Sequence, residues 1–350
     1  MAVYTTIDDS SEHFQIDLYT GTGSSLANTF DGNAAMQPDW VWIKERNGVA
    51  DHAVYDSNRG VQKQLEINDV SVESTESTGL TAFGSDGFTV GGLAQVNTSS
   101  DTYVAWAWKG AGGTTSTNND GAVTSTVQVN STAGFSILTY PMNSNSNETG
   151  GHGLGVAPDI VITKARERGD SNGFWSLYTT IIDGSLDYLK LNTTDAKSNS
   201  SLSAPTSTVF TGAGSSTASY RSFVAYCFKS VQGYSKFDKY VGNGNANGPF
   251  FYTGFKPRWV MLKEITTAGN SWWMFDTARD TYNTADARLV ANTTAAEATG
   301  SFTNVIDFLS NGFKIKNSDS AWNGDGRTYI YMAFAENPFV TSTGIPTTAR

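Results

Sequence analysis

The sequence predicts an all-β protein built from three tandem β-sandwich modules of the jelly-roll or lectin-like kind. A six-residue apolar segment occurs three times, beginning at Tyr103, Phe223 and Tyr329. The copies lie at domain-sized intervals of roughly a hundred residues. Only 16% of the residues are charged, and many of the others are Gly, Ser, Thr and Asn. This composition favours short strands and turns over surface helices.

The repeated segment alternates as a strand does, so that its residues divide between two faces. In the first copy one face is bulky and the other keeps a small residue at Ala107, a place that Cys227 and Ala333 take in the other copies. We expect the bulky faces to fill the core between the sheets of each module, together with tryptophans from a second buried strand. The expected core residues are Trp40, Trp106, Trp108, Tyr226, Phe228, Trp259, Met332 and Phe334.

Further landmarks recur in the same order around each copy. An alternating strand opens each module, at residues 14–18, 135–140 and from 234 onward. A strand that ends in lysine follows a proline, at 38–44, 158–164 and 257–263, and its apolar residues on both faces indicate burial. Ala and Thr make 284–300 the one candidate for a short helix. The predicted division is an N-terminal arm (1–11), module 1 (12–110), a Gly/Ser/Thr/Asn linker (111–121), module 2 (122–230), module 3 (231–338) and a C-terminal tail (339–350).

Composition and motifs argue against several classes of function. A net charge of −10 disfavours nucleic acid as a partner, and a single cysteine excludes an internal disulfide. No signal peptide and no apolar run of membrane-span length is recognisable, so we expect synthesis in a cytoplasm without membrane insertion. His13, His52 and His152 lack a second ligand at metal-binding spacing, and Cys227 replaces alanine. We therefore expect no catalytic residue, no metal and no cofactor.

Two sets of residues are candidates for contacts with a glycan or another subunit. Asp56 with Arg59, and Asp276 with Arg279, recur at the same place in modules 1 and 3. We favour an ion pair that closes a turn, and the alternative is a polar ligand contact. The second set lies near turns and consists of Trp272, Trp273 and Trp322. Core or subunit contacts are favoured for it over a sugar-stacking platform, although alternation places one of the two adjacent tryptophans on an outer face or a packed interface.

The order of these motifs resembles a family of tailed-phage virion proteins, common in marine phages and usually described as tail-fibre or appendage proteins. The matching pieces are Pro38–Lys44, Asp56 with Arg59, Leu65 with Asn68, Ser85–Phe88, Tyr103–Lys109, Gly233–Phe237 and Tyr329–Phe339. The resemblance extends over nearly the whole chain from Phe14 to Phe339. Module 2 departs from it most, because Tyr178-Thr-Thr-Ile181 replaces the Asp-x-x-Arg motif.

The resemblance implies a non-enzymatic bacteriophage structural protein of the virion, a tail fibre or other appendage with a role in binding a host receptor or glycan. A head-decoration protein is one alternative, and a glycan-depolymerising tailspike is another. Its partners would be other virion proteins and further copies of itself, with a homotrimer favoured by analogy. Three modules in a row would make an elongated monomer, and we expect neighbouring modules or subunits to cover its sheet edges.

Overall fold

The computed structural model describes residues 4–142, 148–169, 173–212, 222–300 and 305–347, and nearly all of its regular structure is β. The expected all-β class is confirmed. In these ranges the only helical segments are η1 (Ser10–Glu12) and α1 (Ala94–Asn97). The expected helix within 284–300 does not form, because β24 (Leu289–Val290) pairs with a neighbouring strand instead. No helix of the described residues is long and apolar enough to cross a membrane.

Three large antiparallel sheets share a run of five strands in the same order. Sheet I consists of β1 (Phe14–Thr20), β9 (Thr102–Trp108), β3 (Trp40–Glu45), β4 (Ala53–Asp56), β5 (Lys63–Glu66) and β6 (Ser74–Thr75). Sheet II consists of β10 (Ser116–Asn118), β11 (Ser125–Asn130), β12 (Phe135–Pro141), β19 (Ser222–Phe228), β14 (Ile160–Ala165), β15 (Ser176–Thr179), β16 (Asp187–Lys190) and β17 (Ser198–Asn199). Sheet III consists of β20 (Ser235–Val241), β27 (Thr328–Pro338), β22 (Phe255–Glu264), β23 (Trp272–Asp276) and β24.

A small sheet accompanies each large one along the chain. The first is formed by β2 (Leu26–Thr29), β8 (Gly87–Val90) and β7 (Leu80–Gly84). The second is formed by β13 (Thr149–Gly151) and β18 (Val209–Thr211). The third is formed by β21 (Phe250–Tyr252), β26 (Gly312–Ile315) and β25 (Ile306–Leu309).

The three copies of the repeated segment occupy equivalent places, as β9, β19 and β27. Each lies between the opening strand and the lysine-ending strand of its sheet. The registers agree as well, because Trp108 pairs with Trp40, Phe228 with Ile160 and Phe334 with Trp259. The position of any residue in one sheet can therefore be matched to positions in the other two.

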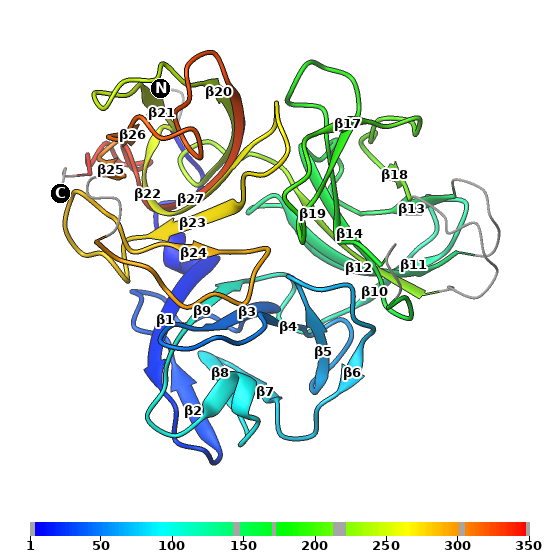
Figure 1. The fold of residues 1–350 in the computed structure, drawn as a ribbon. Helices are drawn as coiled ribbons and strands as arrows, with labels where there is room; N and C mark the ends of the chain where they lie inside the picture. Colours follow the sequence, from blue (N-terminus) through cyan, green and yellow to red (C-terminus); the bar gives the residue numbers. More distant parts are fainter. Residues whose placement is uncertain (1–3, 143–147, 170–172, 213–221, 301–304, 348–350) are drawn as a thin grey trace.

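The bulky faces of the three repeated strands meet in one shared core, around which the three lobes of Figure 1 are grouped. The ring centroids of Trp40 and Tyr226 lie 4.5 Å apart, and those of Phe228 and Phe334 lie 6.0 Å apart. All eight expected core residues are buried. However, the expectation that they lie between the sheets of each module is wrong, as is the elongated monomer. Alternation shows that a face is covered, but it does not show by which layer.

The small faces of the same strands pack inside each lobe instead. Ala107 lies in a separate core with Phe88 and Val90 of the first small sheet. Cys227 and Ala333 are fully buried in the corresponding cores of the other two lobes. A small residue at this position leaves room for the second layer, as the sequence pattern predicted.

The segments predicted as arm and linker are parts of the packed structure. Thr5 Oγ1 donates to the carbonyl of Gln232 at 2.8 Å, and Ile7 is buried in the shared core. The predicted linker 111–121 contains β10, which extends sheet II by pairing with β11. Its glycine-rich start is held by Asp39, whose carboxylate accepts hydrogen bonds from the backbone of residues 110, 112 and 113. Composition indicated flexibility here, but these long-range contacts fix the chain.

We expect the shared core to make Trp106 more costly to truncate than its place in a single lobe would suggest. Trp106→Ala should lower the free energy of unfolding by about 3–5 kcal/mol, because a large cavity opens in the shared core and Asp276 loses the hydrogen bond from the ring of sheet I. Cys227→Ala should cost little, whereas Cys227→Leu should cost about 1–3 kcal/mol through overpacking. Urea denaturation followed by circular dichroism measures all three. A wild-type midpoint for Trp106→Ala would contradict the shared core.

Candidate functional site

The paired charges found in the sequence are buried at the joints between large sheets. The side chains of Asp56 and Arg59 are both fully buried, and so are those of Asp276 and Arg279. In each pair the arginine Nε contacts the aspartate Oδ2, and the arginine backbone N–H donates to Oδ1 at 2.8 and 2.9 Å. The structure thus places an ion pair at a turn. It contradicts the alternative of a ligand contact, because no solvent reaches these groups.

Each buried aspartate also accepts a hydrogen bond from a neighbouring sheet. Tyr226 Oη of sheet II donates to Asp56 Oδ2 at 2.6 Å, and Trp106 Nε1 of sheet I donates to Asp276 Oδ2 at 3.1 Å. Tyr226 and Trp106 hold the same position in β19 and β9. We call the joint between sheets I and II seam I/II, and we name seams II/III and III/I in the same way. The two pairs therefore play equivalent parts in seams I/II and III/I.

A glutamate completes the charge network at each of these two seams. Glu73 contacts Arg59 at 3.0 Å and Arg166 of sheet II at 2.7 Å. Burial alone would raise the pKa of Glu73, but its hydrogen bond with Arg166 and the charges of both arginines lower it overall. At seam III/I, Glu297 lies in the same way between Arg279 at 3.0 Å and Arg46 at 2.8 Å.

Sequence analysis missed both glutamates and their partners across the seams. The available signal was weak: Arg46 and Arg166 each follow a strand-ending lysine by two residues. Nothing in the spacing of Glu73 or Glu297 indicates a partner, because the partner comes from another sheet.

Seam II/III keeps the backbone geometry of the other two but not their charges. The N–H of Glu73 donates to the carbonyl of Arg166 at 2.7 Å, and the N–H of Glu297 donates to that of Arg46 at 2.7 Å. At seam II/III the equivalent hydrogen bond is donated by the backbone N–H of Lys197 to the carbonyl of Ile265 at 3.1 Å. At seam II/III the strand register puts Thr179 in the place of the aspartate and Ile182 in the place of its arginine. The sequence alignment with Tyr178 and Ile181 was therefore wrong by one residue. Lys197 takes the place of the glutamate, and Ile265 takes that of the second arginine.

A ring N–H crosses each seam from a second equivalent position. Trp175 Nε1 donates to the carbonyl of Glu66 at 2.8 Å, and Trp272 Nε1 donates to that of Lys190 at 3.0 Å. His52 takes this position in sheet I, with Nε2 at 3.1 Å from the carbonyl of Val290. Its Nδ1 accepts from a tryptophan Nε1, which leaves the ring proton on Nε2.

The three candidate tryptophans lie in packed surroundings. Trp272 faces the shared core at a packed seam, and Trp322 is fully buried. Trp273 is partly buried and packs against Trp322, with ring centroids 5.0 Å apart, at the edge of the core in the lobe of sheet III. The expectation that one of Trp272 and Trp273 faces a packed interface agrees with this arrangement.

Exposed aromatic rings lie on β21 instead. Phe250 is 43% exposed and Tyr252 is 49% exposed, on the same face of the strand. Opposite Tyr252 the neighbouring strand carries Gly312, which leaves the ring uncovered. Tyr4 Oη lies 3.1 Å from Tyr252 Oη. Sequence reasoning missed this surface because three consecutive aromatic residues at 250–252 resemble a core strand.

The histidines and the cysteine are buried, and burial moves the pKa of each away from its ordinary value. Burial, with the charge of Lys109, lowers the pKa of His13 to about 4, and burial, with Lys44, lowers that of His52 to about 3. His152 is fully buried, which lowers its pKa. Burial raises the pKa of Cys227 far above its ordinary value, so this thiol is not an activated nucleophile.

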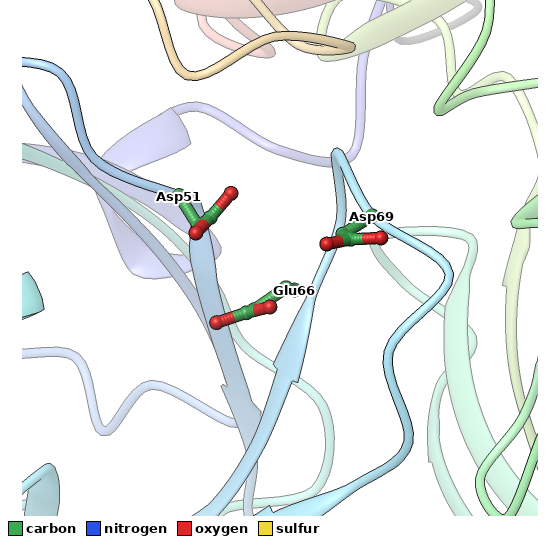
Figure 2. Close-up of side chains that lie close together, drawn as sticks. All are labelled: Asp51, Glu66 and Asp69. Carbon is green, nitrogen blue, oxygen red and sulfur yellow. The ribbon is translucent and has the colours of Figure 1, made fainter. Parts of the chain in front are cut away.

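One group of carboxylates in the described residues is close enough to share a cation. Figure 2 shows Asp51, Glu66 and Asp69, whose oxygens lie within 4.8 Å of one another. Asn68 Nδ2 donates to Asp51 Oδ1 at 2.6 Å. Burial and the charge of Asp51 raise the pKa of Glu66. Oxygen ligands of this kind suit hard cations such as Ca²⁺. The sequence did not reveal the group, because the pairing of β4 with β5 brings Asp51 to the other two.

Acid should destabilise the fold through its buried neutral histidines. A histidine whose pKa is lowered by folding leaves stability unchanged at a pH above its unfolded-state pKa of about 6.5. As the pH falls from there toward the folded-state pKa, the unfolded chain takes up the proton first, and stability is lost. For His13 the window runs from about 6.5 to about 4. Each histidine contributes at most about 1.4 kcal/mol per pH unit. Urea midpoints of wild type and His13→Gln should diverge across this window and run parallel above pH 7; parallel curves throughout would contradict the assignment.

Comparison with known proteins gives a family but no described activity. No curated protein and no solved structure matches the chain. A family model described as a domain of unknown function, DUF7483, matches residues 9–338, which include all three large sheets. The chain therefore belongs to the DUF7483 family.

Proposed function

We propose that this chain is a non-enzymatic structural protein of a tailed-phage virion, a tail fibre or other appendage. The observation that carries the proposal is that buried charged groups and a buried histidine form contacts that hold the sheets together. Both Asp–Arg pairs, the two seam glutamates and His52 are occupied in contacts between sheets. Such an interior suits a rigid scaffold. The phage assignment is supported by the motif order from Pro38 to Phe339.

As an appendage, the protein would assemble with other virion proteins and with copies of itself. The homotrimer remains an expectation by analogy. The structure gives no elongated monomer whose sheet edges other subunits would have to cover, since the three sheets surround one core. Light scattering of the purified chain distinguishes a 37.5 kDa monomer from a self-assembled form.

A glycan-cleaving tailspike is the alternative from another class, and one observation favours it. Glu66 has a raised pKa beside Asp51, and a general acid with a second carboxylate nearby is what glycoside hydrolysis requires. Incubation with host capsule or lipopolysaccharide tests this alternative. Oligosaccharide released by wild type but not by Glu66→Gln would replace the structural assignment with an enzymatic one.

Labelling the chain in virions tests the proposal directly. A tag placed after residue 347 and detected by electron microscopy should appear on the tail of purified particles. Label spread over the head would favour the head-decoration alternative. Purified virions that lack the chain by mass spectrometry would show that it is not a virion protein.

If the appendage contacts a host glycan, we expect the exposed rings of β21 to make the contact, since aromatic faces suit sugar rings. Alanine at both Phe250 and Tyr252 should weaken binding to host cells by about tenfold, the loss of two modest ring contacts. Tyr282→Ala is the matched control, because this ring is 83% exposed elsewhere. Equal losses in the double variant and in the control would argue against a site on β21.

A further inference from the structure

Seams I/II and II/III each carry a surface hollow at the same place in the fold. At seam I/II the hollow has a volume of about 270 Å³ and is lined by Val72, Glu73, Arg166, Glu167 and Ser222. At seam II/III it has about 410 Å³ and is lined by Ile182, Lys197, Lys239, Val241, Ile265, Thr266 and Thr328. An equivalent backbone hydrogen bond lies beside each hollow. The N–H of Arg166 donates to the carbonyl of Ser222 at 2.9 Å, and the N–H of Ile265 donates to the carbonyl of Thr328 at 3.0 Å.

The larger volume at seam II/III follows from its residue changes. In seam I/II two guanidinium groups and the carboxylate of Glu73 occupy the joint. In seam II/III isoleucines replace both arginines, and Lys197 takes the place of the glutamate. The branched apolar side chains are shorter than arginine and pair with nothing charged. The hollow at seam II/III is therefore apolar at its base, and no carboxylate is among its lining residues.

The two lysines that line this hollow differ in what they offer a ligand. Lys197 directs its ammonium to Asp183 at 3.1 Å, Asp187 at 2.8 Å and Asn199 at 3.1 Å, which occupies all three of its donors. Lys239 donates to the carbonyl of Ile182. Two of its three N–H donors therefore remain for an anion.

We propose that the hollow at seam II/III binds a small organic carboxylate. The carboxylate would meet the Lys239 ammonium, the hydroxyls of Thr266 and Thr328 would bond polar groups of the ligand, and its body would cover Ile182 and Ile265. The volume is within the range of small-molecule sites. One available cation suits a monoanion, whereas phosphate sites usually gather arginines or several backbone N–H groups. The assignment does not depend on the chain being a virion protein.

The ligand could be a free organic acid or a carboxylated sugar of a glycan. Calorimetry of the full chain with butyrate and with glucuronate distinguishes these sources, and glucose and inorganic phosphate complete the series. We expect at least one carboxylate to bind, with affinity that falls as salt increases. Tighter binding of glucuronate indicates a sugar, and tighter binding of butyrate indicates an apolar acid. Glucose or phosphate binding more tightly than both carboxylates would overturn the proposal, as would no binding of either carboxylate.

Two variants locate the site. Lys239→Met should weaken carboxylate binding about tenfold or more, the loss of a charge-assisted contact. Lys236→Met is the matched control, because it removes the same charge from the opposite face of β20. Val241→Trp fills the hollow from its rim, where Val241 is 57% exposed, and should abolish binding without changing the melting temperature. Undiminished binding in Lys239→Met, or equal losses in Lys239→Met and Lys236→Met, would overturn the proposal.

Discussion

The structure depends on the burial of three bulky strand faces in one shared core. Trp40 stacks on Tyr226 across one seam, and Phe228 meets Phe334 across another. A large sheet of this protein carries apolar residues on both faces, and its small sheet covers only one of them. The second face would remain in water if the sheet stood alone, at a cost of about 25 cal/mol per Å². Closure of the three sheets around one another removes all three faces from water together.

Closure of the core also decides where polar groups must find partners. Charges at a packed joint are tolerated only when they are paired and hydrogen-bonded. Seams I/II and III/I meet this requirement with a carboxylate between two arginines, whereas seam II/III meets it by replacing both arginines with isoleucine. One equivalent backbone hydrogen bond is kept at all three seams, while the charged side chains change. Seam II/III is thus free to differ in chemistry while the architecture is preserved.

This distribution of chemistry bears on function. Groups that would attract attention in the sequence, such as Asp56 with Arg59 or His52, stabilise the joints and face no solvent. Surface features of the described residues include the rings of Phe250 and Tyr252, the carboxylates around Glu66 and the hollow beside Lys239. A scaffold with small recognition surfaces is consistent with these features.

The sequence by itself determined the all-β class, the burial of the repeated strands and the small residue at Ala107, because alternation and side-chain volume are local properties. It also indicated that Asp56 and Arg59 form a pair, since an aspartate and an arginine recur at the same place in module 3. It could not indicate that Trp106 reaches Asp276, or that Glu73 reaches Arg166. Those contacts join distant parts of the chain, and only the packing of the three sheets around one core brings their atoms within bonding distance.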